Sequence, residues 1–593
     1  MVNLNICDDH HLQILDSLVT FRKRKVNVMI KTMEKVIPTE LNTMDLVHES
    51  FMREKVEVIF SSCDSILSPF YSYLQQEHRI QTVFMKHEQA IVHAADGYAR
   101  ATGNIGLAVI PAGSGITNAI TGIATAQMDS VPLVILTIQP AKKLCDDSQI
   151  VDTFGMTLPI VKYHFHVNDI NEFQDIIKKA FTIAGEGRPG PVLIEMQEEL
   201  LMKIVPYSRE YFTEKKDTNL PRTFSTKLVE QIKNEVMSAQ KPVLFIGGGV
   251  SISGADKLVQ ELAEKANIPV VSTMMGLGSF PGTHPLFLGM VGMHGTFAAN
   301  RAVHRCDLLI CLGLRFSDRV TGKISGFSPR SRKIQVDIDS AEINKIIKVD
   351  IPIVGDIKEF LQQINPFVVP GNTEDWVNEV SSWQKKVPRY SDSDSKGNLK
   401  PQQVIELLDY YSNSNAVVAT DVGQHQIWTS HYYQFHKPRT FITSGGLGTM
   451  GYGLPAAIGA ALANTGKEVI LVSGDGSFQM NFQELLTVAQ YQLPIKIAIL
   501  KNSYLGMVRQ WQEMFYHGRY SSVKMSSPNF TALAAAYGID GAAATSLQEA
   551  ANIIQKAFQH NKPFLMVFDI TEEENVFPIV PPGGNNTEAV YKK

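Results

Sequence analysis

The sequence is poor in cysteine, has no long hydrophobic run and carries little net charge. Its five cysteines are odd in number, scattered and without a Cys-x-x-Cys pair: Cys7, Cys63, Cys145, Cys306 and Cys311. This usage argues against a disulfide framework or a zinc site and fits a reducing compartment. We therefore expect a cytoplasmic protein, with the plastid stroma as the alternative if the chain is organelle-encoded.

The other absences exclude whole classes of partner. No apolar run approaches the roughly 18 residues that a membrane span needs, so we expect no membrane protein. A net charge of -4 gives no reason to expect nucleic-acid or membrane-surface binding. The basic run at residues 22–25 is not followed by the apolar core of a secretory signal, and nearby acidic residues argue against a transit peptide.

What the sequence does contain is three successive segments in which apolar strands alternate with helical stretches. This alternation predicts an α/β fold of three consecutive doubly wound parallel-sheet domains. We expect the following division: an N-terminal extension at 1–41, domains at 42–207, 226–367 and 401–580, a linker at 368–400 and a tail at 581–593. A polar linker at 208–224 ends the first domain, and the Pro- and Gly-rich tail predicts an irregular end or a lid.

The most informative motif is Gly474-Asp475-Gly476, followed by Asn502. Each polar residue follows an apolar run, 469–472 or 495–500, that predicts a buried parallel strand. Asp475 and Asn502 should therefore lie at the C-terminal edge of one sheet, where open α/β folds place ligands. Carboxylate, amide and carbonyl oxygens suit Mg²⁺ with a phosphate group, and glycines let the backbone approach it. The alternative is an ordinary strand-to-helix turn.

A second carboxyl group, Glu88, opens a predicted helix rich in small residues after the apolar stretch 83–85. A carboxylate at a helix N-terminus is also an ordinary stabilising feature. Thiamine diphosphate chemistry, however, requires a carboxyl group that hydrogen-bonds the aminopyrimidine ring of the cofactor, which then acts as the electron sink.

The motifs together resemble the catalytic subunit of acetolactate synthase (acetohydroxyacid synthase), a thiamine-diphosphate-dependent family. The resemblance covers about residues 42–580 and rests on these stretches: 87–103, 117–132, 187–191, 421–426, 443–451, 474–478 and 501–511. It implies thiamine diphosphate, Mg²⁺ and FAD as cofactors, with pyrimidine-binding, FAD-binding and diphosphate-binding domains in that order.

The resemblance also assigns roles to individual residues. Glu88, Gln149 and Trp511 would be catalytic or line the substrate pocket, although Trp511 could instead be a core aromatic. Asp475, Asn502 and the carbonyl of Tyr504 would bind Mg²⁺. The thiamine diphosphate would be held by Gln424, His425, Gly448, Met450, Gly474, Gly476, Ser477 and Met507.

In the middle segment, glycines, an arginine and an acid at a strand end suit a dinucleotide. By the resemblance, FAD would be held by Arg188, Gly247, Gly248, Gly249, Thr273, Met274, Met293, His294, Gly295, Gly313, Arg315, Asp318, Arg319, Asp337 and Ile338. A degenerate domain without FAD is the alternative. The flavin takes no redox part in the main reaction of this family.

Departures from the family pattern gather in the first segment, at 61–65, 111–115, 148–150 and 197–199, with Leu158 in place of an arginine. Serine in place of glycine disfavours positive φ, so we expect the first of these loops to be rebuilt. These positions surround the acceptor site in the family, so the departures favour an altered acceptor as the alternative.

The predicted reaction is therefore that of acetolactate synthase. Pyruvate is decarboxylated and its hydroxyethyl unit is joined to pyruvate or 2-ketobutyrate, for valine, leucine and isoleucine biosynthesis. The resemblance implies a homodimer or tetramer, with Glu88 of one subunit facing Asp475 of another, and a separate regulatory small subunit. The alternatives are a related carboligase or decarboxylase with another acceptor, and a weakly active cofactor-binding homologue with a regulatory role.

Overall fold

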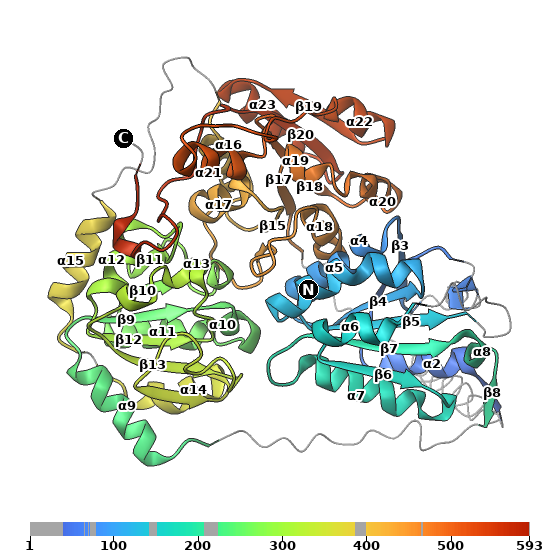
Figure 1. Cartoon of the computed structure of the whole chain (residues 1–593), viewed down its shortest axis with the longest axis horizontal. Helices are drawn as coiled ribbons and strands as arrows, with labels where there is room; N and C mark the ends of the chain where they lie inside the picture. Colours follow the sequence, from blue (N-terminus) through green and yellow to red (C-terminus); the bar gives the residue numbers. More distant parts are fainter. Residues whose placement is uncertain are drawn as a thin grey trace, which may run out of the picture.

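The computed structural model forms three lobes, each built on a six-stranded parallel sheet (Figure 1). It describes residues 40–64, 66–68, 70–71, 79–140, 151–206, 223–369, 371–385, 399–463 and 466–591. The predicted α/β class with three parallel-sheet domains is confirmed. Residues 1–39 of the expected N-terminal extension, with its basic run, and residues 208–222 of the expected linker at 208–224 lie outside the described residues.

The first domain has the strand order β3-β2-β4-β5-β7-β6. Its strands are β2 (Val58–Ser62), β3 (Gln81–Met85), β4 (Gly106–Pro111), β5 (Leu133–Gln139), β6 (Tyr163–Val167) and β7 (Pro191–Gln197). Its main helices are α2 (Thr43–Arg53), α4 (Glu88–Thr102), α5 (Ser114–Asp129), α6 (Thr153–Thr157), α7 (Phe173–Gly185) and α8 (Glu198–Leu201). A short antiparallel pair, β1 (Glu40–Asn42) with β8 (Ile204–Pro206), closes the domain.

The central domain has the strand order β11-β10-β9-β12-β13-β14. Its strands are β9 (Pro242–Ile246), β10 (Val270–Ser272), β11 (Phe287–Met290), β12 (Leu308–Leu312), β13 (Arg332–Asp337) and β14 (Ile351–Val354). Its helices are α9 (Thr226–Ser238), α10 (Gly248–Ser253), α11 (Asp256–Ala266), α12 (Phe297–Arg305), α13 (Asp318–Thr321), α14 (Ile357–Ile364) and α15 (Glu374–Gln384).

The third domain has the strand order β16-β15-β17-β18-β20-β19. Its strands are β15 (Val417–Thr420), β16 (Phe441–Ile442), β17 (Val469–Gly474), β18 (Ile495–Lys501), β19 (Asp540–Ala544) and β20 (Phe564–Asp569). Its helices are α16 (Pro401–Tyr411), α17 (Gln424–Tyr432), α18 (Gly453–Leu462), α19 (Asp475–Phe478), α20 (Leu485–Gln490), α21 (Gly506–Phe515), α22 (Phe530–Ala536) and α23 (Leu547–Phe558).

The segment expected to be a linker at 368–400 contains a packed helix in its first half. Helix α15 places Trp376 and Trp383 in a hydrophobic cluster of the central domain. The indole Nε1 of Trp376 also donates to the carbonyl of Pro242, 3.0 Å away. Two buried indoles hold this helix on the domain, so the expectation of a linker was wrong for this part. Its second half, 386–398, lies outside the described residues.

The C-terminal tail packs on the central domain over its described part, 581–591. The amide of Lys323 donates to the carbonyl of Gly584 at 2.9 Å. The ring of Tyr591 lies edge-on to Phe297, with 5.8 Å between the ring centres. The tail therefore joins the third domain to the surface around α12 and α13 (Figure 1).

The first and third domains share one hydrophobic core. A single cluster of buried side chains includes Leu133 and Ile135 of the first sheet and Leu471 and Ile497 of the third. Helices α4 and α18 cross at its centre with their backbones in close contact. A Cβ built on Gly97 would lie 2.2 Å from the carbonyl oxygen of Ala456. Glycine is therefore required at this crossing because there is no room for a side chain, and not because of its backbone conformation.

Replacing Gly459 by alanine is expected to destabilise this crossing. Its Cβ would lie 1.9 Å from the carbonyl oxygen of Ala94, so two buried helices must move apart. Such overpacking costs about 2 kcal/mol or more, which lowers the melting temperature by about 4–8 °C for a domain of this size. The matched control is Gly185→Ala, at an exposed helical glycine whose added Cβ would meet only Ile105, at 3.7 Å. Equal melting temperatures for the two variants in a thermal scan would contradict the proposed crossing.

None of the helices in the described residues combines the length and the apolar character that crossing a membrane requires.

Candidate active site

Strands β17 and β18 pair in parallel and end at the same edge of the third sheet. Asp475 begins α19 directly after β17, and Asn502 follows β18. The carboxylate of Asp475 accepts hydrogen bonds from the hydroxyl of Ser527 at 2.7 Å and from the amide of Ser503 at 3.1 Å. Burial raises the pKa of Asp475 above its ordinary value, although these hydrogen bonds lower it. No ion pair to Asp475 is formed by the described residues, and a buried carboxyl group of this kind suits a bound metal ion.

The neighbouring strand β15 brings Gln424 and His425 to the same edge, at the start of α17. The amide oxygen of Gln424 lies 3.5 Å from Nδ2 of Asn502. A Cβ on Gly474 would lie 2.9 Å from Nδ1 of His425. The hydroxyl of Ser477 donates to the carbonyl of Val422 at 2.8 Å. The predicted diphosphate and metal residues of the third domain therefore gather in one place.

His425 gives the clearest indication that this edge can bind a polar ligand. Its side chain is buried, and its Nε2 has no hydrogen-bond partner among the described residues. Burial lowers the pKa of His425 to about 3, so the ring is neutral near pH 7. A buried ring nitrogen without a partner is rare in folded proteins, so this edge fits a bound polar group such as a diphosphate.

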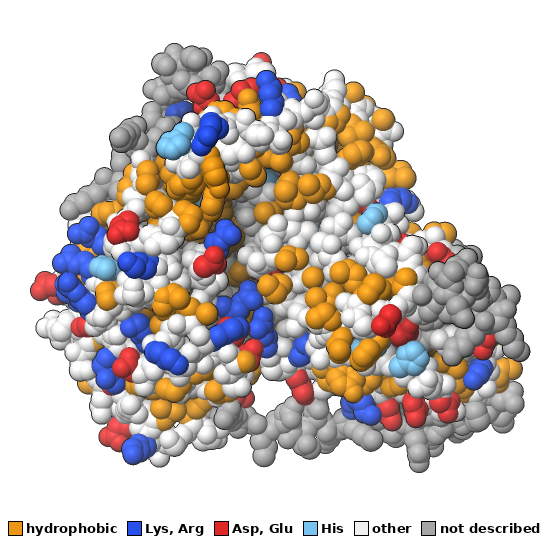
Figure 2. Space-filling model, in the orientation of Figure 1, with side chains coloured by type: hydrophobic (Ala, Val, Ile, Leu, Met, Phe, Trp, Pro, Cys, Tyr) orange, Lys and Arg blue, Asp and Glu red, His pale blue; other side chains and the backbone are white. Residues whose placement is uncertain are grey.

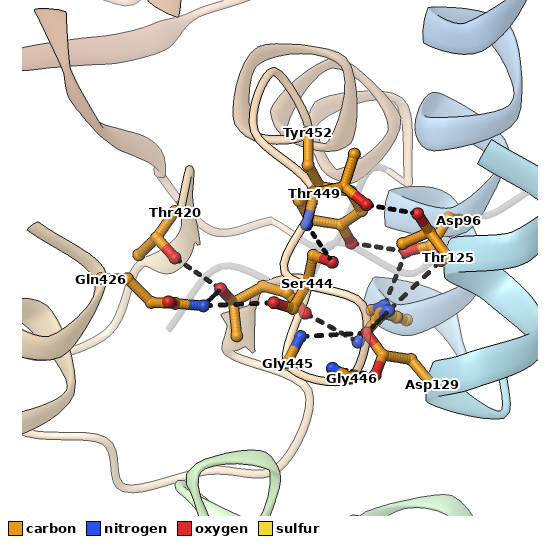
Figure 3. Close-up of polar contacts among 12 residues, drawn as sticks. Asp96, Thr125, Asp129, Thr420, Gln426, Ser444, Gly445, Gly446, Thr449 and Tyr452 are labelled. Carbon is orange, nitrogen blue, oxygen red and sulfur yellow. Dashed lines mark hydrogen bonds and ion pairs between the residues drawn. The ribbon is translucent and has the colours of Figure 1, made fainter. Parts of the chain in front are cut away.

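Gly448 and Met450 lie on the loop 443–452, which is held from two sides (Figure 3). From the first domain, Asp129 accepts hydrogen bonds from the amides of Gly445 and Gly446, at 3.1 and 2.6 Å. From the third domain, Gln426 donates to the hydroxyl of Thr443 at 2.7 Å. The loop is therefore fixed by residues of both domains.

Glu88 lies at the first position of α4, as expected, with His87 as the capping residue. Its carboxylate accepts a hydrogen bond from Nδ2 of Asn118 at 3.0 Å. Glu88 is partly buried, and among the described residues no hydrogen bond joins it to Asp475 or Asn502. Within the described part of one chain, no hydrogen bond therefore links the two predicted halves of the thiamine site. Gln149, the other residue predicted in this domain, lies outside the described residues.

A cleft of about 1530 Å³ lies where the three domains meet. In Figure 2 it opens with Lys and Arg side chains gathered on one side and hydrophobic side chains on the other. Gly448, Met507 and Trp511 of the third domain line it. So do most residues predicted to hold FAD: Arg188, Gly248, Gly249, Thr273, Met274, Met293, His294, Gly313, Arg315, Asp318, Arg319, Asp337 and Ile338.

The two remaining predicted FAD residues lie behind the lining. Gly247 packs under the turn after β12, where an added Cβ would lie 2.3 Å from the carbonyl oxygen of Gly313. Gly295 closes a turn next to His294, because its backbone amide donates a hydrogen bond to the carbonyl of Gly292 at 2.8 Å. Both positions shape the backbone of the cleft rather than its surface.

The charges in the cleft fit a dinucleotide. No carboxylate among the described residues forms an ion pair with the Arg315 guanidinium, which is therefore available for a phosphate. Asp337 ends β13, and burial raises its pKa to about 6. An acid at a strand end beside a glycine turn is the arrangement that binds a ribose and pyrophosphate in doubly wound folds.

The altered segment 61–65 of the first domain begins inside a strand. Strand β2 runs through Ser61 and Ser62, and neither serine has a positive φ. The hydroxyl of Tyr71 donates to the carbonyl of Ser62 at 2.6 Å and contacts the hydroxyl of Ser61. A serine–tyrosine contact therefore occupies the start of this segment; Ser65 and the loop 148–150 lie outside the described residues.

The loop 111–115 lies directly beside Glu88. Gly113 has a φ of 69°, so the glycine at this position is required by its backbone conformation. A Cβ on Gly115 would lie 2.7 Å from Cγ of Pro111 and 3.5 Å from Cγ of Glu88. The altered sequence therefore lies next to the carboxyl group that the sequence predicts to be catalytic.

Sequence reasoning missed three residues that position the site. Asp421 is buried and accepts from the amides of Gly451 and Val422, at 2.8 and 3.0 Å. Ser527 donates to Asp475, and Asp129 holds the loop 443–452. The strand-end position of Asp421 was a usable signal, whereas nothing in the sequence marks Ser527.

Comparisons with known proteins agree with this arrangement. Three family models match in order: the N-terminal TPP binding domain of thiamine pyrophosphate enzymes at residues 41–163, their central domain at 229–364 and their C-terminal TPP binding domain at 421–568.

Curated relatives are similar over nearly the whole chain. The acetolactate synthase isozyme 3 large subunit of Escherichia coli (strain K12) is 39% identical over 93% of this chain and 99% of its own length. The acetolactate synthase large subunit of Cyanidium caldarium is 41% identical over 91% of this chain and 95% of its own. The acetolactate synthase of Mycobacterium leprae is 39% identical over 94% of this chain and 92% of its own length.

Proposed function

Because the chain belongs to the family of acetolactate synthase large subunits, we propose that it decarboxylates pyruvate and joins the two-carbon unit to a second 2-ketoacid. The predicted acetolactate synthase function, thiamine diphosphate dependence and place in branched-chain amino-acid biosynthesis are confirmed by this membership. The observation that carries the proposal is the sheet edge where Asp475, Asn502 and the unpaired Nε2 of His425 lie together.

At this edge, Asp475, Asn502 and the carbonyl of Tyr504 would bind Mg²⁺, which neutralises the diphosphate. His425, Gln424 and Ser477 would surround the diphosphate oxygens. Bound thiamine diphosphate supplies the electron sink for decarboxylation. The protein's own part is to orient the reactants, exclude water and hold a proton at Glu88.

The cleft between the domains would hold FAD. Its unpaired Arg315, its glycine turn at 247–249 and its acid at Asp337 support this assignment. Trp511 lines the same cleft near Met507, so its indole would border both the flavin and the substrate pocket. In that position it can restrict the size of the second 2-ketoacid, where one methylene is worth about 1–3 kcal/mol.

A complete site would need a second copy of the chain. Glu88 is partly exposed, and no hydrogen bond among the described residues joins it to the Asp475 edge of its own chain. In a homodimer, Glu88 of one subunit would face Asp475 of the other, and a tetramer would repeat this pair. The relatives are large subunits, which supports a catalytic role for this chain beside a separate regulatory small subunit. Free thiols at Cys63, Cys306 and Cys311 support a reducing compartment, the cytoplasm or the plastid stroma.

One observation favours a second candidate, a carboligase of the same family with another acceptor. The rewritten loop 111–115 touches Glu88, and the rewritten start of 61–65 is closed by Tyr71. Both changes lie in the domain that carries Glu88, so they would alter the space for the second 2-ketoacid while leaving the diphosphate edge unchanged.

The test is a product assay with purified protein, pyruvate, thiamine diphosphate, Mg²⁺ and FAD. We expect acetolactate, measured as acetoin after acidification, and no product when thiamine diphosphate is omitted. Release of CO₂ or another ligation product without acetolactate would instead support the altered acceptor. Bound cofactor with no turnover would support a cofactor-binding homologue with a regulatory role.

A further inference from the structure

Two histidines and a glutamate converge on the outer strand pair of the first domain, away from the proposed cofactor sites. His164 and His166 lie two residues apart on β6, so their side chains share one face of the sheet. Glu195 lies on the adjacent strand β7, in register with His166. Its Oε2 is 3.3 Å from Nε2 of His164 and 3.3 Å from Nδ1 of His166.

These distances match the edges of a metal coordination shell. A tetrahedral ion with bonds of about 2.0–2.1 Å needs ligand atoms about 3.3–3.4 Å apart. Both His–Glu separations have this length, and all three ligand atoms lie within 4.8 Å of one another. The side chain of His166 is 48% exposed and can rotate to close the remaining distance.

The other nitrogen of His164 is fixed as a metal ligand requires. Its Nδ1 lies 3.2 Å from the hydroxyl of Thr157. That hydroxyl donates its only proton to the carbonyl of Thr153 at 2.7 Å, so it can only accept from Nδ1. Nδ1 therefore carries a proton, and Nε2 faces a carboxylate. A neutral ring in this setting presents a lone pair to a cation at Nε2; the competing state without metal is an imidazolium paired with Glu195.

The carboxylate is oriented by a second layer of polar groups. Oε1 of Glu195 accepts a hydrogen bond from the amide of Gln139, which also donates to the hydroxyl of Thr153 at 3.3 Å. Oε2 is thereby directed at the two histidines. Partners of this kind hold the first ligands of protein metal sites in place. Thr137, in register with Glu195 on β5, adds a buried hydroxyl with no hydrogen-bond partner among the described residues.

Burial makes the cluster enclosed but accessible. The side chains of His164 and Glu195 are 2% and 8% exposed, while His166 lies at the surface. Phe154 covers the ring of His164 at 5.1 Å between ring centres. An ion can therefore enter past His166, and water can occupy a fourth position there.

We propose that His164, His166 and Glu195 bind one divalent transition-metal ion of the zinc class, with water as the fourth ligand. Two imidazoles and a carboxylate favour Zn²⁺, Co²⁺ or Ni²⁺ over Mg²⁺. Through the contacts of Thr157 and Thr153, the ion would attach α6 to the edge of the sheet. In the sequence, α6 follows shortly after Gln149. The number and spacing of the cysteines argued against a zinc site. That argument applies only to sites with cysteine ligands, and the site proposed here has none.

The test uses the full-length protein without an affinity tag, stripped with a chelator and then saturated with Mg²⁺ and thiamine diphosphate so that the diphosphate edge is occupied. Zn²⁺ is added, unbound metal is removed, and bound zinc per chain is measured by elemental analysis. Co²⁺ serves as a second probe, read by the visible absorption of four-coordinate cobalt. We expect about one ion per chain.

The variants His166→Gln and Glu195→Gln should each weaken Zn²⁺ binding at least about tenfold. His166→Gln changes an exposed side chain, so its folding is not at risk. The matched control is His284→Gln, since His284 forms an isolated pair with Glu264 at 3.2 Å and lacks a third ligand. Zinc should also raise the melting temperature and slow hydrogen exchange over 153–157 in the wild type and in the control only.

No retained zinc in the wild type would overturn the proposal, because the cluster would then be an ion pair of His164 with Glu195. Zinc binding that is equal in the wild type, His166→Gln and Glu195→Gln would overturn it as well, because the ion would lie elsewhere. The readout is metal content rather than turnover, so it is independent of the acetolactate synthase reaction.

Discussion

Replacing Glu88 by glutamine is expected to lower kcat by about 10²–10⁴-fold. Glu88 begins α4 and is held in place by Asn118. Glutamine keeps the size and the hydrogen-bonding capacity of the side chain but cannot hold a proton and release it. The diphosphate edge lies elsewhere in the chain, so the affinity for thiamine diphosphate with Mg²⁺ should change little.

Turnover is measured as acetolactate formed, and cofactor affinity by fluorescence or calorimetric titration. The control is Glu374→Gln, because Glu374 also begins a helix, α15, but lies in the central domain. It should leave both quantities unchanged. A Glu88→Gln enzyme with wild-type kcat would refute the proton-holding role, and a matching loss of cofactor affinity would indicate that Glu88 mainly supports the fold.

Replacing Asp475 by asparagine is expected to weaken the binding of thiamine diphosphate with Mg²⁺ by at least about 10–100-fold, as loss of a supporting metal partner alone can do. The amide keeps the shape but lacks the charge that a divalent cation requires. Activity at low Mg²⁺ should fall in proportion, and higher Mg²⁺ should restore part of it. The measurement is a Mg²⁺ titration of turnover and of cofactor binding.

Two further variants separate the metal role from general damage to this sheet edge. Ser527→Ala removes the hydroxyl that donates to Asp475 at 2.7 Å, so it should weaken binding by about tenfold or less. Asp569→Asn changes the acid at the end of the next strand, β20, where it pairs with Lys501 at 2.6 Å. It should have no effect on the Mg²⁺ dependence. Equal losses in Asp475→Asn and Asp569→Asn would contradict the assignment of Asp475 as a metal ligand.

The parts of the site that the sequence predicted are those with a local signal. Asp475 and Asn502 each follow an apolar strand, and parallel strands end at a common edge, so their proximity follows from the pattern. The places of Glu88 at the start of α4 and of the glycine turn at 247–249 after β9 followed from similar strand-to-helix patterns, whereas their roles stay predictions. In each case the order along the chain fixes the position in the sheet.

The parts that the sequence did not predict depend on contacts between distant segments. Ser527 reaches Asp475 from an irregular stretch without periodicity. Helix α15 was expected to be a linker, because charged and polar residues surround the indoles of Trp376 and Trp383 that anchor it. The cluster of His164, His166 and Glu195 arises only when β6 pairs with β7. The sequence shows the two histidines as a His-x-His pattern, but it does not show that Glu195 lies beside them.

The crossing of α4 and α18 limits which substitutions the two helices can accept independently of each other. Gly97 fits only against the bare backbone at Ala456, and Gly459 only against that at Ala94. If either glycine is replaced by a larger residue, the facing helix must move, although α4 and α18 are far apart in sequence. A chimaera whose first and third domains come from different relatives should therefore keep this shared core only if glycine is retained at both positions.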